Sequence, residues 1–438
     1  MLNRYILQQS VTSRDDVTDQ QPMPPESSAG ASAPNAVIRR FPALGYRDFR
    51  LLWLGQIVSI SGSQMQNVAI GWEIYERTGS AVMLGLVGLA RVVPIIVFSL
   101  LGGVVADSYN RRRIMMLSQS VAMLSAIALG TLSALDLSSA AEILSLTAVT
   151  AASAAFDNPA RQSLVPNLVA PEHLTNAVSL NMMLFHTAMI AGPALAGVLI
   201  ATVDVSIVYW INAATFLAVI AALAAMRIRE RPSPGRSHVT RGAFLEGLRF
   251  VRSNRTIWAT MLLDFFATFF ASATALIPVF AKEVLGVGAG GMGLLYSAEA
   301  VGSLIAGAVM STLPDPRRKG TLLLGSVMLY GAATALYGLS TNYVLSLGLL
   351  ALVGAGDSVS TVLRSTIRQK ATPDYIRGRM TSVNMLFFMG GPQLGNLEAG
   401  IVAGLIGAPL AVVTGGVATV VVVALMAWIY PTLRRFEA

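Results

Sequence analysis

Long apolar runs separated by short polar turns are the feature that most constrains how this chain can fold. Twelve runs are long enough to cross a bilayer, for which a helix needs about 20 apolar residues. Because they are continuous rather than alternating at every second residue, they predict helices and not barrel strands. The runs are roughly 50–76, 80–106, 113–135, 140–160, 174–202, 205–226, 257–281, 290–313, 320–340, 342–363, 380–405 and 408–430. The expected fold is therefore an all-α membrane protein with twelve transmembrane helices.

Basic residues are concentrated on one side of this pattern. Nearly all of the 31 Lys and Arg residues are assigned to the two tails or to alternate turns between the runs. Such turns face the cytoplasm in multi-spanning proteins, so both termini are predicted to be cytoplasmic. The assigned residues include Arg111, Arg112 and Arg113 after the second run, Arg161 after the fourth, Arg317, Arg318 and Lys319 after the eighth, and Arg364, Arg368, Lys370, Arg377 and Arg379 after the tenth.

Composition excludes several classes of function. The chain is 54% hydrophobic and 12% charged, whereas soluble domains carry about 25% charged residues. Its net charge of +8 is explained by topology, so no nucleic-acid partner is inferred. Cysteine is absent and the three histidines are scattered, which offers no metal site. No Gly-Lys dipeptide and no Gly-x-Ser-x-Gly motif occurs, so neither ATP hydrolysis nor any other enzyme activity is predicted.

An internal repeat divides the chain. Arg161 and Arg364, Gly192 and Gly395, and Gly197 and Gly400 are each 203 residues apart, which predicts a duplicated six-helix unit. The expected parts are a disordered cytoplasmic tail (1–40), a six-helix half (41–226), a cytoplasmic basic linker (227–255), a second six-helix half (256–430) and a tail (431–438). The linker is either an amphipathic surface helix or simply a basic connection.

The turn after the second run carries a family motif. Gly103, Asp107, Arg111 and Arg112 match the loop 2–3 signature of the major facilitator superfamily, whereas Ser108 and Asn110 depart from it. The stretch 156–166 and the motif Arg377, Gly378 and Arg379 in loop 10–11 resemble an efflux branch that includes the enterobactin exporter. The resemblance implies a monomeric, multi-pass protein of the bacterial inner membrane. It also implies that the loop 2–3 residues latch the cytoplasmic side.

The fifth run resembles an antiporter signature of the same superfamily. Gly192, Pro193 and Gly197 match it, and the other positions stay small. Small residues also let membrane helices pack closely. A role in export and simple close packing therefore both remain open.

Ionisable residues within the runs are candidates for the working site. A charge at mid-membrane costs at least about 2.5 kcal/mol and usually faces a cavity or a partner. We hypothesise that one or more of Glu299, Asp357 and Asp264 couples proton movement to transport. The alternative is a structural ion pair, such as Arg91 with a carboxylate of the other half. The full set of candidates is Arg91, Asp157, Asp264, Glu299, Asp357 and Glu398.

Three functions fit these observations. The first is proton-driven efflux of a small amphiphilic or aromatic solute, such as a siderophore or a drug, by alternating access. The second is import by the same fold. The third is a membrane receptor or scaffold that no longer transports. The exporter-like motifs favour the first, which needs no cofactor other than a proton gradient.

Overall fold

A computed structural model describes residues 40–227 and 241–434. The chain divides into Met1–Phe41 and Pro42–Ala438, and the second unit is described here. Most of the predicted tail (1–40), part of the linker (228–240) and the last residues (435–438) lie outside the described residues. The helices are α2 (Arg47–Thr78), α3 (Ala81–Ser108), α4 (Arg111–Ala134), α5 (Ala140–Leu164), α6 (Leu174–Thr202), α7 (Val205–Ala225), α8 (Arg241–Ser253), α9 (Arg255–Phe270), α10 (Ile277–Val279), α11 (Gly288–Thr312), α12 (Lys319–Leu339), α13 (Tyr343–Ala371), α14 (Arg377–Ile406), α15 (Ala408–Ile429) and α16 (Pro431–Arg434).

The described part of the chain is helical and contains ten segments long and apolar enough to cross a membrane. The all-α membrane class is therefore confirmed. Two further long helices, α2 and α14, are not among the ten. Helix α2 contains the polar residues Gln56, Gln66 and Glu73, and these residues lower the mean hydropathy of the segment. All three are buried in the protein.

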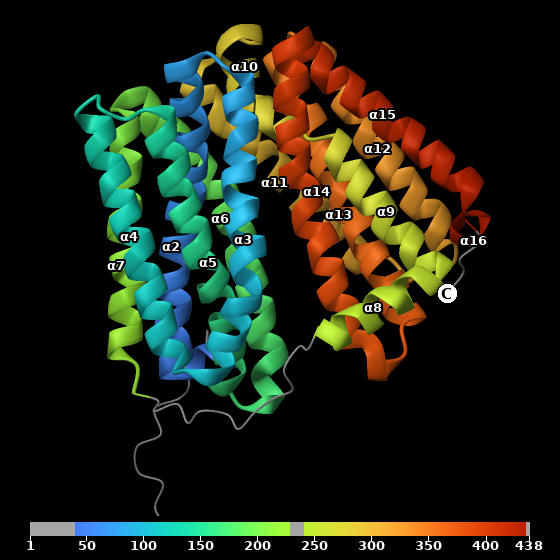
Figure 1. The fold of residues 1–438 in the computed structure, drawn as a ribbon, viewed down its shortest axis with the longest axis horizontal. Helices are drawn as coiled ribbons and strands as arrows, with labels where there is room; N and C mark the ends of the chain where they lie inside the picture. The colour runs from blue at the N-terminus through green and yellow to red at the C-terminus, as the bar shows by residue number, and fades with distance from the viewer. Residues whose placement is uncertain (1–39, 228–240, 435–438) are drawn as a thin grey trace, which may run out of the picture. The chain divides into compact units, whose positions relative to one another are not determined.

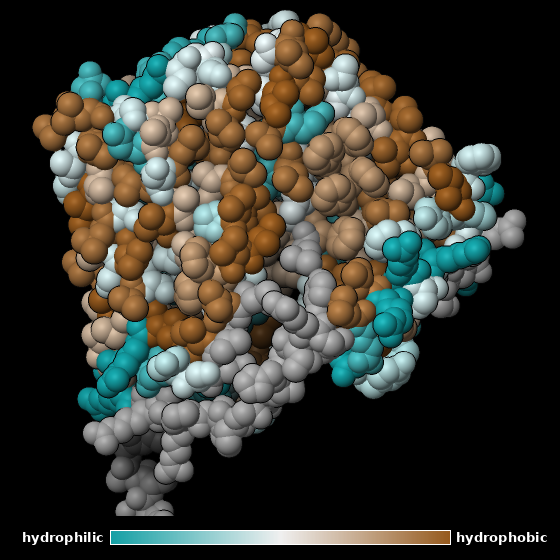
Figure 2. All heavy atoms as spheres, viewed as in Figure 1, coloured by the Kyte–Doolittle hydropathy of each residue, from teal (hydrophilic) through white to brown (hydrophobic). Residues whose placement is uncertain are grey.

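Helices α2–α7 pack on one another, and so do α9 and α11–α15. We call these sets the N-terminal and C-terminal helix groups (Figure 1). Figure 1 also defines two ends, the α10 end at the top and the α8 end at the bottom, where α8 crosses the ends of α9 and α14. Apolar side chains cover most of the visible face, and hydrophilic ones gather toward its ends (Figure 2), as expected for a surface that contacts lipid.

Among the clusters formed by the described residues, the one that joins the two groups lies at the α10 end. One cluster combines Ile70 and Ala196 of the N-terminal group with Phe280, Met292 and Ala403 of the C-terminal group. The other clusters among the described residues each stay within one group.

Glycines allow helices of the two groups to approach closely. A Cβ on Gly197 of α6 would lie 2.9 Å from the Cα of Gly293 in α11. In the equivalent crossing, a Cβ on Gly400 of α14 would lie 2.9 Å from the Cα of Gly85 in α3. Membrane helices approach this closely only where the side chains are small.

Candidate functional site

A cluster of deeply buried charges lies between α9 and α13. Arg364 Nη1 is 2.8 Å from Asp264 Oδ1, and both side chains are 2% exposed. Arg368 Nη1 lies 3.6 Å from the other carboxylate oxygen, Oδ2. Arg364 Nη2 also donates a hydrogen bond to Thr361 Oγ1 at 2.9 Å. Removing the Asp264 charge would leave both arginines without their common counter-charge inside the protein, which is strongly destabilising.

Two further carboxylates extend this cluster toward α11. Arg364 Nη2 lies 3.5 Å from Asp357 Oδ1, and the Asp357 side chain is 43% exposed. One turn earlier in α13, Gly354 packs against the backbone oxygen of Glu299, which brings Glu299 within electrostatic range of Asp357. Glu299 makes no hydrogen bond or ion pair to any other described residue. Below, Glu299, Asp357, Arg364, Asp264 and Arg368 are called the charge chain.

The prediction that Arg364 and Arg368 lie in a turn after the tenth run is wrong. Both lie inside α13, which continues to Ala371, because their charges are compensated by Asp264 within the protein. The signal for this pairing was present in the sequence. A carboxylate in one apolar run needs a partner, and two arginines four residues apart on one helix face can supply it.

The N-terminal group has a weaker counterpart of this cluster. Arg161, the repeat equivalent of Arg364, donates to Gln56 Oε1 at 3.4 Å and lies 3.8 Å from Asp157 Oδ2. Gln119 Nε2 donates to Asp157 Oδ1 at 3.0 Å. Gln56 and Asp264 occupy the same position relative to the first residues of α2 and α9. A neutral amide thus stands in one repeat where a carboxylate stands in the other.

Arg91 and Glu398 are not part of either cluster. Arg91 lies in α3 and Glu398 in α14, and both are partly buried. Within residues 40–227 and 241–434, neither forms an ion pair. Asp264 and Asp357 of the charge chain have Arg364 and Arg368 as partners instead.

The loop 2–3 motif joins α3 to α4. Arg111 begins α4, and Arg112 donates hydrogen bonds to the carbonyl oxygens of Met226 (3.1 Å) and Ala224 (2.9 Å). A cation is favourable at this position because the carbonyl end of α7 carries a partial negative charge. Arg112 therefore stabilises the N-terminal group itself.

Gly103 has open space beside it, since an added Cβ would meet no atom within 4 Å. The side chain of Asp107 lies outside the described part of the chain. Gly103 lies in α3 toward the α8 end, where the hydrophobic clusters do not join the two groups.

The two other predicted motifs lie at helix contacts. Gly192 packs against α2, while Pro193 and Gly197 pack against α11 at the crossing between the groups. In the loop 10–11 motif, Arg377 and Gly378 begin α14. Arg379 Nη1 of this motif pairs with Glu246 Oε1 of α8 at 2.5 Å.

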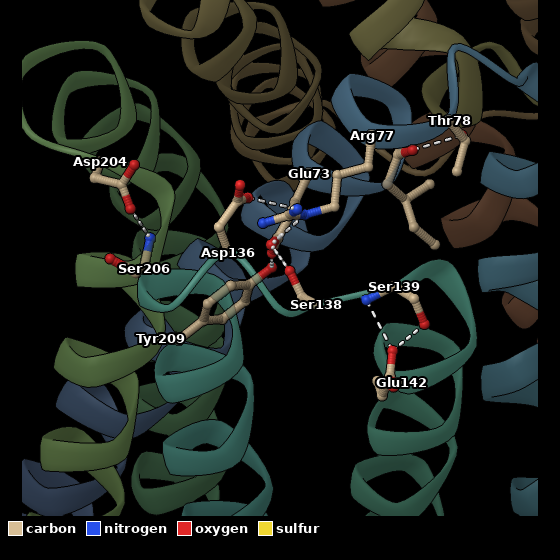
Figure 3. A network of polar contacts seen from close by, with 11 residues as sticks. Glu73, Arg77, Thr78, Asp136, Ser138, Ser139, Glu142, Asp204, Ser206 and Tyr209 are labelled. Carbon is tan, nitrogen blue, oxygen red and sulfur yellow. Dashed lines mark hydrogen bonds and ion pairs between the residues drawn. The ribbon is translucent and has the colours of Figure 1, made fainter.

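A second set of polar contacts, which the sequence did not reveal, lies at the α10 end of the N-terminal group (Figure 3). Glu73 is 2% exposed and accepts hydrogen bonds from Arg77, Ser138 and Tyr209 at 3.0, 2.6 and 2.7 Å. Arg77 also pairs with Asp136 at 2.9 Å. These contacts tie together the ends of α2 and α7 and the turn between α4 and α5.

Nearby, Asp204 begins α7 by accepting a hydrogen bond from the Ser206 backbone N–H at 2.8 Å (Figure 3). Hydrogen bonding from Ser206 lowers the pKa of Asp204, so this cap persists in mildly acidic solution.

Polar contacts also connect the two groups at the α10 end. The Tyr75 hydroxyl of α2 donates a hydrogen bond to the Glu283 carboxylate, in the segment between α10 and α11. Lys282 Nζ lies 5.9 Å from the ring centroid of Trp72 and 6.0 Å from that of Tyr75. Cations are attracted to aromatic faces at this distance. We call Trp72, Tyr75, Lys282 and Glu283 the α10-end latch.

Comparisons with known proteins agree with this architecture. The sequence profile of a family described as transmembrane secretion effector matches residues 40–438. The chain is 26% identical to the enterobactin exporter EntS of Shigella boydii over 390 residues, which are 89% of this chain and 93% of that protein. The same identity and coverage hold for the enterobactin exporter EntS of Escherichia coli.

Solved structures of more distant proteins share the fold. A bacterial homologue of the human lysosomal transporter Spinster, inward-facing and unoccupied, has a TM-score of 0.68 at 17% identity and covers 90% of this chain and 97% of its own. An inward-facing bacterial homologue of the iron transporter ferroportin has a TM-score of 0.64 at 19% identity, covering 89% and 99%. The nucleoside transporter NupG has a TM-score of 0.69 at 11% identity, covering 87% and 100%.

Proposed function

Because the chain belongs to the transmembrane secretion effector family of the major facilitator superfamily, we propose that it is a proton-driven exporter of a small amphiphilic or aromatic solute. The chain is a multi-pass transporter of the major facilitator type and not an enzyme. Export is supported by its similarity to proteins named as enterobactin exporters. The charge chain is the observation that supports the coupling of transport to protons.

The proposed topology has twelve spanning helices in two six-helix halves. Ten are the apolar segments described above, and we add α2 and α14, whose lengths of 32 and 30 residues exceed what a bilayer requires. The basic residues of the turns support a cytoplasmic location for the α8 end and for both termini. The protein acts as a monomer in the bacterial inner membrane.

Transport is proposed to occur by alternating access, in which the two halves rock about a central site. The shared hydrophobic cluster and the latch at the α10 end support a closed external side. At the α8 end the clusters stay within one group, which supports an inward-facing state. In the outward-facing state, Gly103, Asp107, Arg111 and Arg112 would close the cytoplasmic side. The open space beside Gly103 leaves room for that contact.

Protons are proposed to bind at Glu299 and then at Asp357. Glu299 has no partner among the described residues, so its charge is not compensated, whereas Asp264 is held by two arginines. Asp357 is half-exposed and shares Arg364 with Asp264. Loss of the Asp357 charge would therefore strengthen the pairing between Arg364 and Asp264. This exchange gives a physical route from protonation to a movement of α13 against α9.

Two alternatives make different predictions. An importer of the same fold would raise, rather than lower, the amount of solute in the cell. A receptor or scaffold would bind without transport. The charge chain favours a transporter, because a static helix contact can be built at lower cost from apolar residues.

The deciding experiment measures solute accumulation in efflux-deficient bacteria that express the chain. The panel contains catecholates and amphiphilic drugs, with and without a protonophore. We expect lower accumulation of at least one compound, reversed by the protonophore. Higher accumulation would identify an importer, and no change for any compound would support the receptor or scaffold.

Glu299→Gln tests the proposed proton carrier. We expect a loss of proton-driven export of at least tenfold, with binding of the solute retained, because the amide keeps the shape but cannot release a proton. Glu172→Gln is the matched control, since Glu172 is exposed in the turn before α6. Normal export by the Glu299 variant would contradict the assignment.

A further inference from the structure

We propose that α8 anchors the protein to its membrane by binding the headgroups of anionic lipids in the leaflet at the α8 end. The proposal uses the membrane topology given above, but neither the direction of transport nor its coupling to protons. It can therefore hold or fail independently of the proposed export.

One face of α8 is occupied by the protein itself. A Cβ on Gly247 would lie 2.9 Å from the backbone oxygen of Arg379, so α8 touches the first turn of α14. Val251 is fully buried in a cluster with Met380 and Val383. The ion pair between Glu246 of α8 and Arg379 of α14 adds to this contact. The helix is thus fixed in orientation.

The opposite face is free and basic. Leu245, Arg249 and Arg252 follow one another at intervals of four and three residues, which places them on one side of a helix. Leu245 is 56% exposed, and both arginines are exposed. Neither arginine forms an ion pair with a residue in the described ranges. Two uncompensated positive charges therefore follow an exposed apolar side chain along one face of α8.

This face lies at the level of the membrane surface. Asn254 accepts hydrogen bonds from the backbone N–H groups of Thr256 and Ile257 at 3.1 and 3.2 Å, and so begins α9 directly after α8. The apolar segment that crosses the membrane starts at Arg255, so Arg252 precedes it by less than one turn. Figure 1 shows α8 crossing the ends of α9 and α14 rather than continuing along them.

Anionic lipid is the partner whose chemistry fits all three residues. Guanidinium groups form paired hydrogen bonds with phosphate oxygens, and basic residues beside a membrane are attracted to its negative surface. Leu245 would insert between headgroups, as apolar residues of interfacial helices do. Free phosphate would use the arginines but not Leu245.

A fluorescent label at position 245 tests the proposal in the full-length protein. The sequence has no cysteine, so Leu245→Cys provides a single attachment point for an environment-sensitive dye. The protein is placed in nanodiscs of phosphatidylcholine with increasing amounts of phosphatidylglycerol. We expect the anionic lipid to shift the emission to shorter wavelength and to reduce quenching by acrylamide, a neutral aqueous quencher, several-fold.

Charge variants identify the cause of the protection. Arg249→Gln with Arg252→Gln should weaken the lipid interaction about thirty-fold, since each arginine accounts for roughly a factor of five, and protection should be lost. Arg249→Lys with Arg252→Lys keeps the charge and should retain most of it. The matched control is Arg317→Gln with Arg318→Gln, two exposed residues between α11 and α12, which should behave as the parent protein.

Several results would overturn the proposal. The label could be equally protected with and without phosphatidylglycerol, or the Arg249 and Arg252 glutamine variant could keep its protection. Equal loss in the Arg317 and Arg318 control would show a general charge effect. Protection by inorganic phosphate in discs of phosphatidylcholine alone would identify an anion site rather than a lipid site.

Discussion

At the scale of single residues, the charge chain sets what the C-terminal group tolerates. Asp264→Asn should leave Arg364 and Arg368 without their common counter-charge and lower the free energy of unfolding by about 3–5 kcal/mol. Asp357→Asn should cost much less, because Asp357 is half-exposed and its contact with Arg364 is longer. Thermal unfolding of the purified protein measures both.

A double variant separates the pair from its surroundings. Asp264→Asn combined with Arg364→Gln removes both charges, so it should be less destabilising than the sum of the two single variants. Additive effects would mean that the two side chains do not interact in solution.

The sequence could predict the carboxylates of this cluster, but it did not place the two arginines that pair with them inside the helix. Asp264, Glu299 and Asp357 were found because each interrupts an apolar run. Arg364 and Arg368 were misplaced because basic residues near the end of a run are also what a cytoplasmic turn contains. Only the packing of α13 against α9 distinguishes the two cases. Glu73 was missed for a similar reason, since its partners come from α2 itself, from the turn between α4 and α5, and from α7.

At the scale of helices, the crossing of α6 and α11 depends on a glycine. A Cβ on Gly293 would lie 2.4 Å from the backbone oxygen of Pro193, so Gly293→Ala should force the helices apart and lower stability by about 1–3 kcal/mol. Gly325→Ala is the matched control, because no atom lies within 4 Å of its Cβ position in α12. That change should be neutral or stabilising by up to about 1 kcal/mol, since alanine favours helix. Melting temperatures that move in the same direction would contradict this account.

The helices themselves were largely predictable from the apolar runs, because in lipid each segment must satisfy its own backbone hydrogen bonds. The contact between α6 and α11 was not predictable in the same way. Gly192, Pro193 and Gly197 indicated close packing, but a run of small residues does not say which helix it faces. The structure supplies Gly293 as the partner of Gly197.

At the scale of the whole molecule, the α10-end latch should set the balance between the two states. Glu283→Gln replaces the charged acceptor of the Tyr75 hydrogen bond, which is worth about 1.5–3 kcal/mol. The population with an open α10 end should then rise by about tenfold or more. Glu76→Gln is the control, since Glu76 is exposed at the same end and forms no hydrogen bond or ion pair with the C-terminal group in the described structure.

Spin labels can measure this shift, since the chain has no cysteine to remove. Tyr109→Cys with Leu313→Cys reports on the α8 end, and Val203→Cys with Val344→Cys reports on the α10 end; all four side chains are more than half exposed. The Glu283 variant should shorten the first distance and lengthen the second. Unchanged distances would mean that the latch does not hold the closed state.

The distribution of polar contacts also bears on how the protein is made. The partners of Glu73 all belong to the N-terminal group, and the residues of the charge chain all belong to the C-terminal group. The contact between the groups consists mostly of apolar side chains and of glycines packed against backbone. Exposing such surfaces to lipid requires little free energy. The N-terminal group can therefore complete its own polar contacts while the ribosome is still synthesising the second half. Two separately translated halves should then be able to insert one after the other and join within the bilayer.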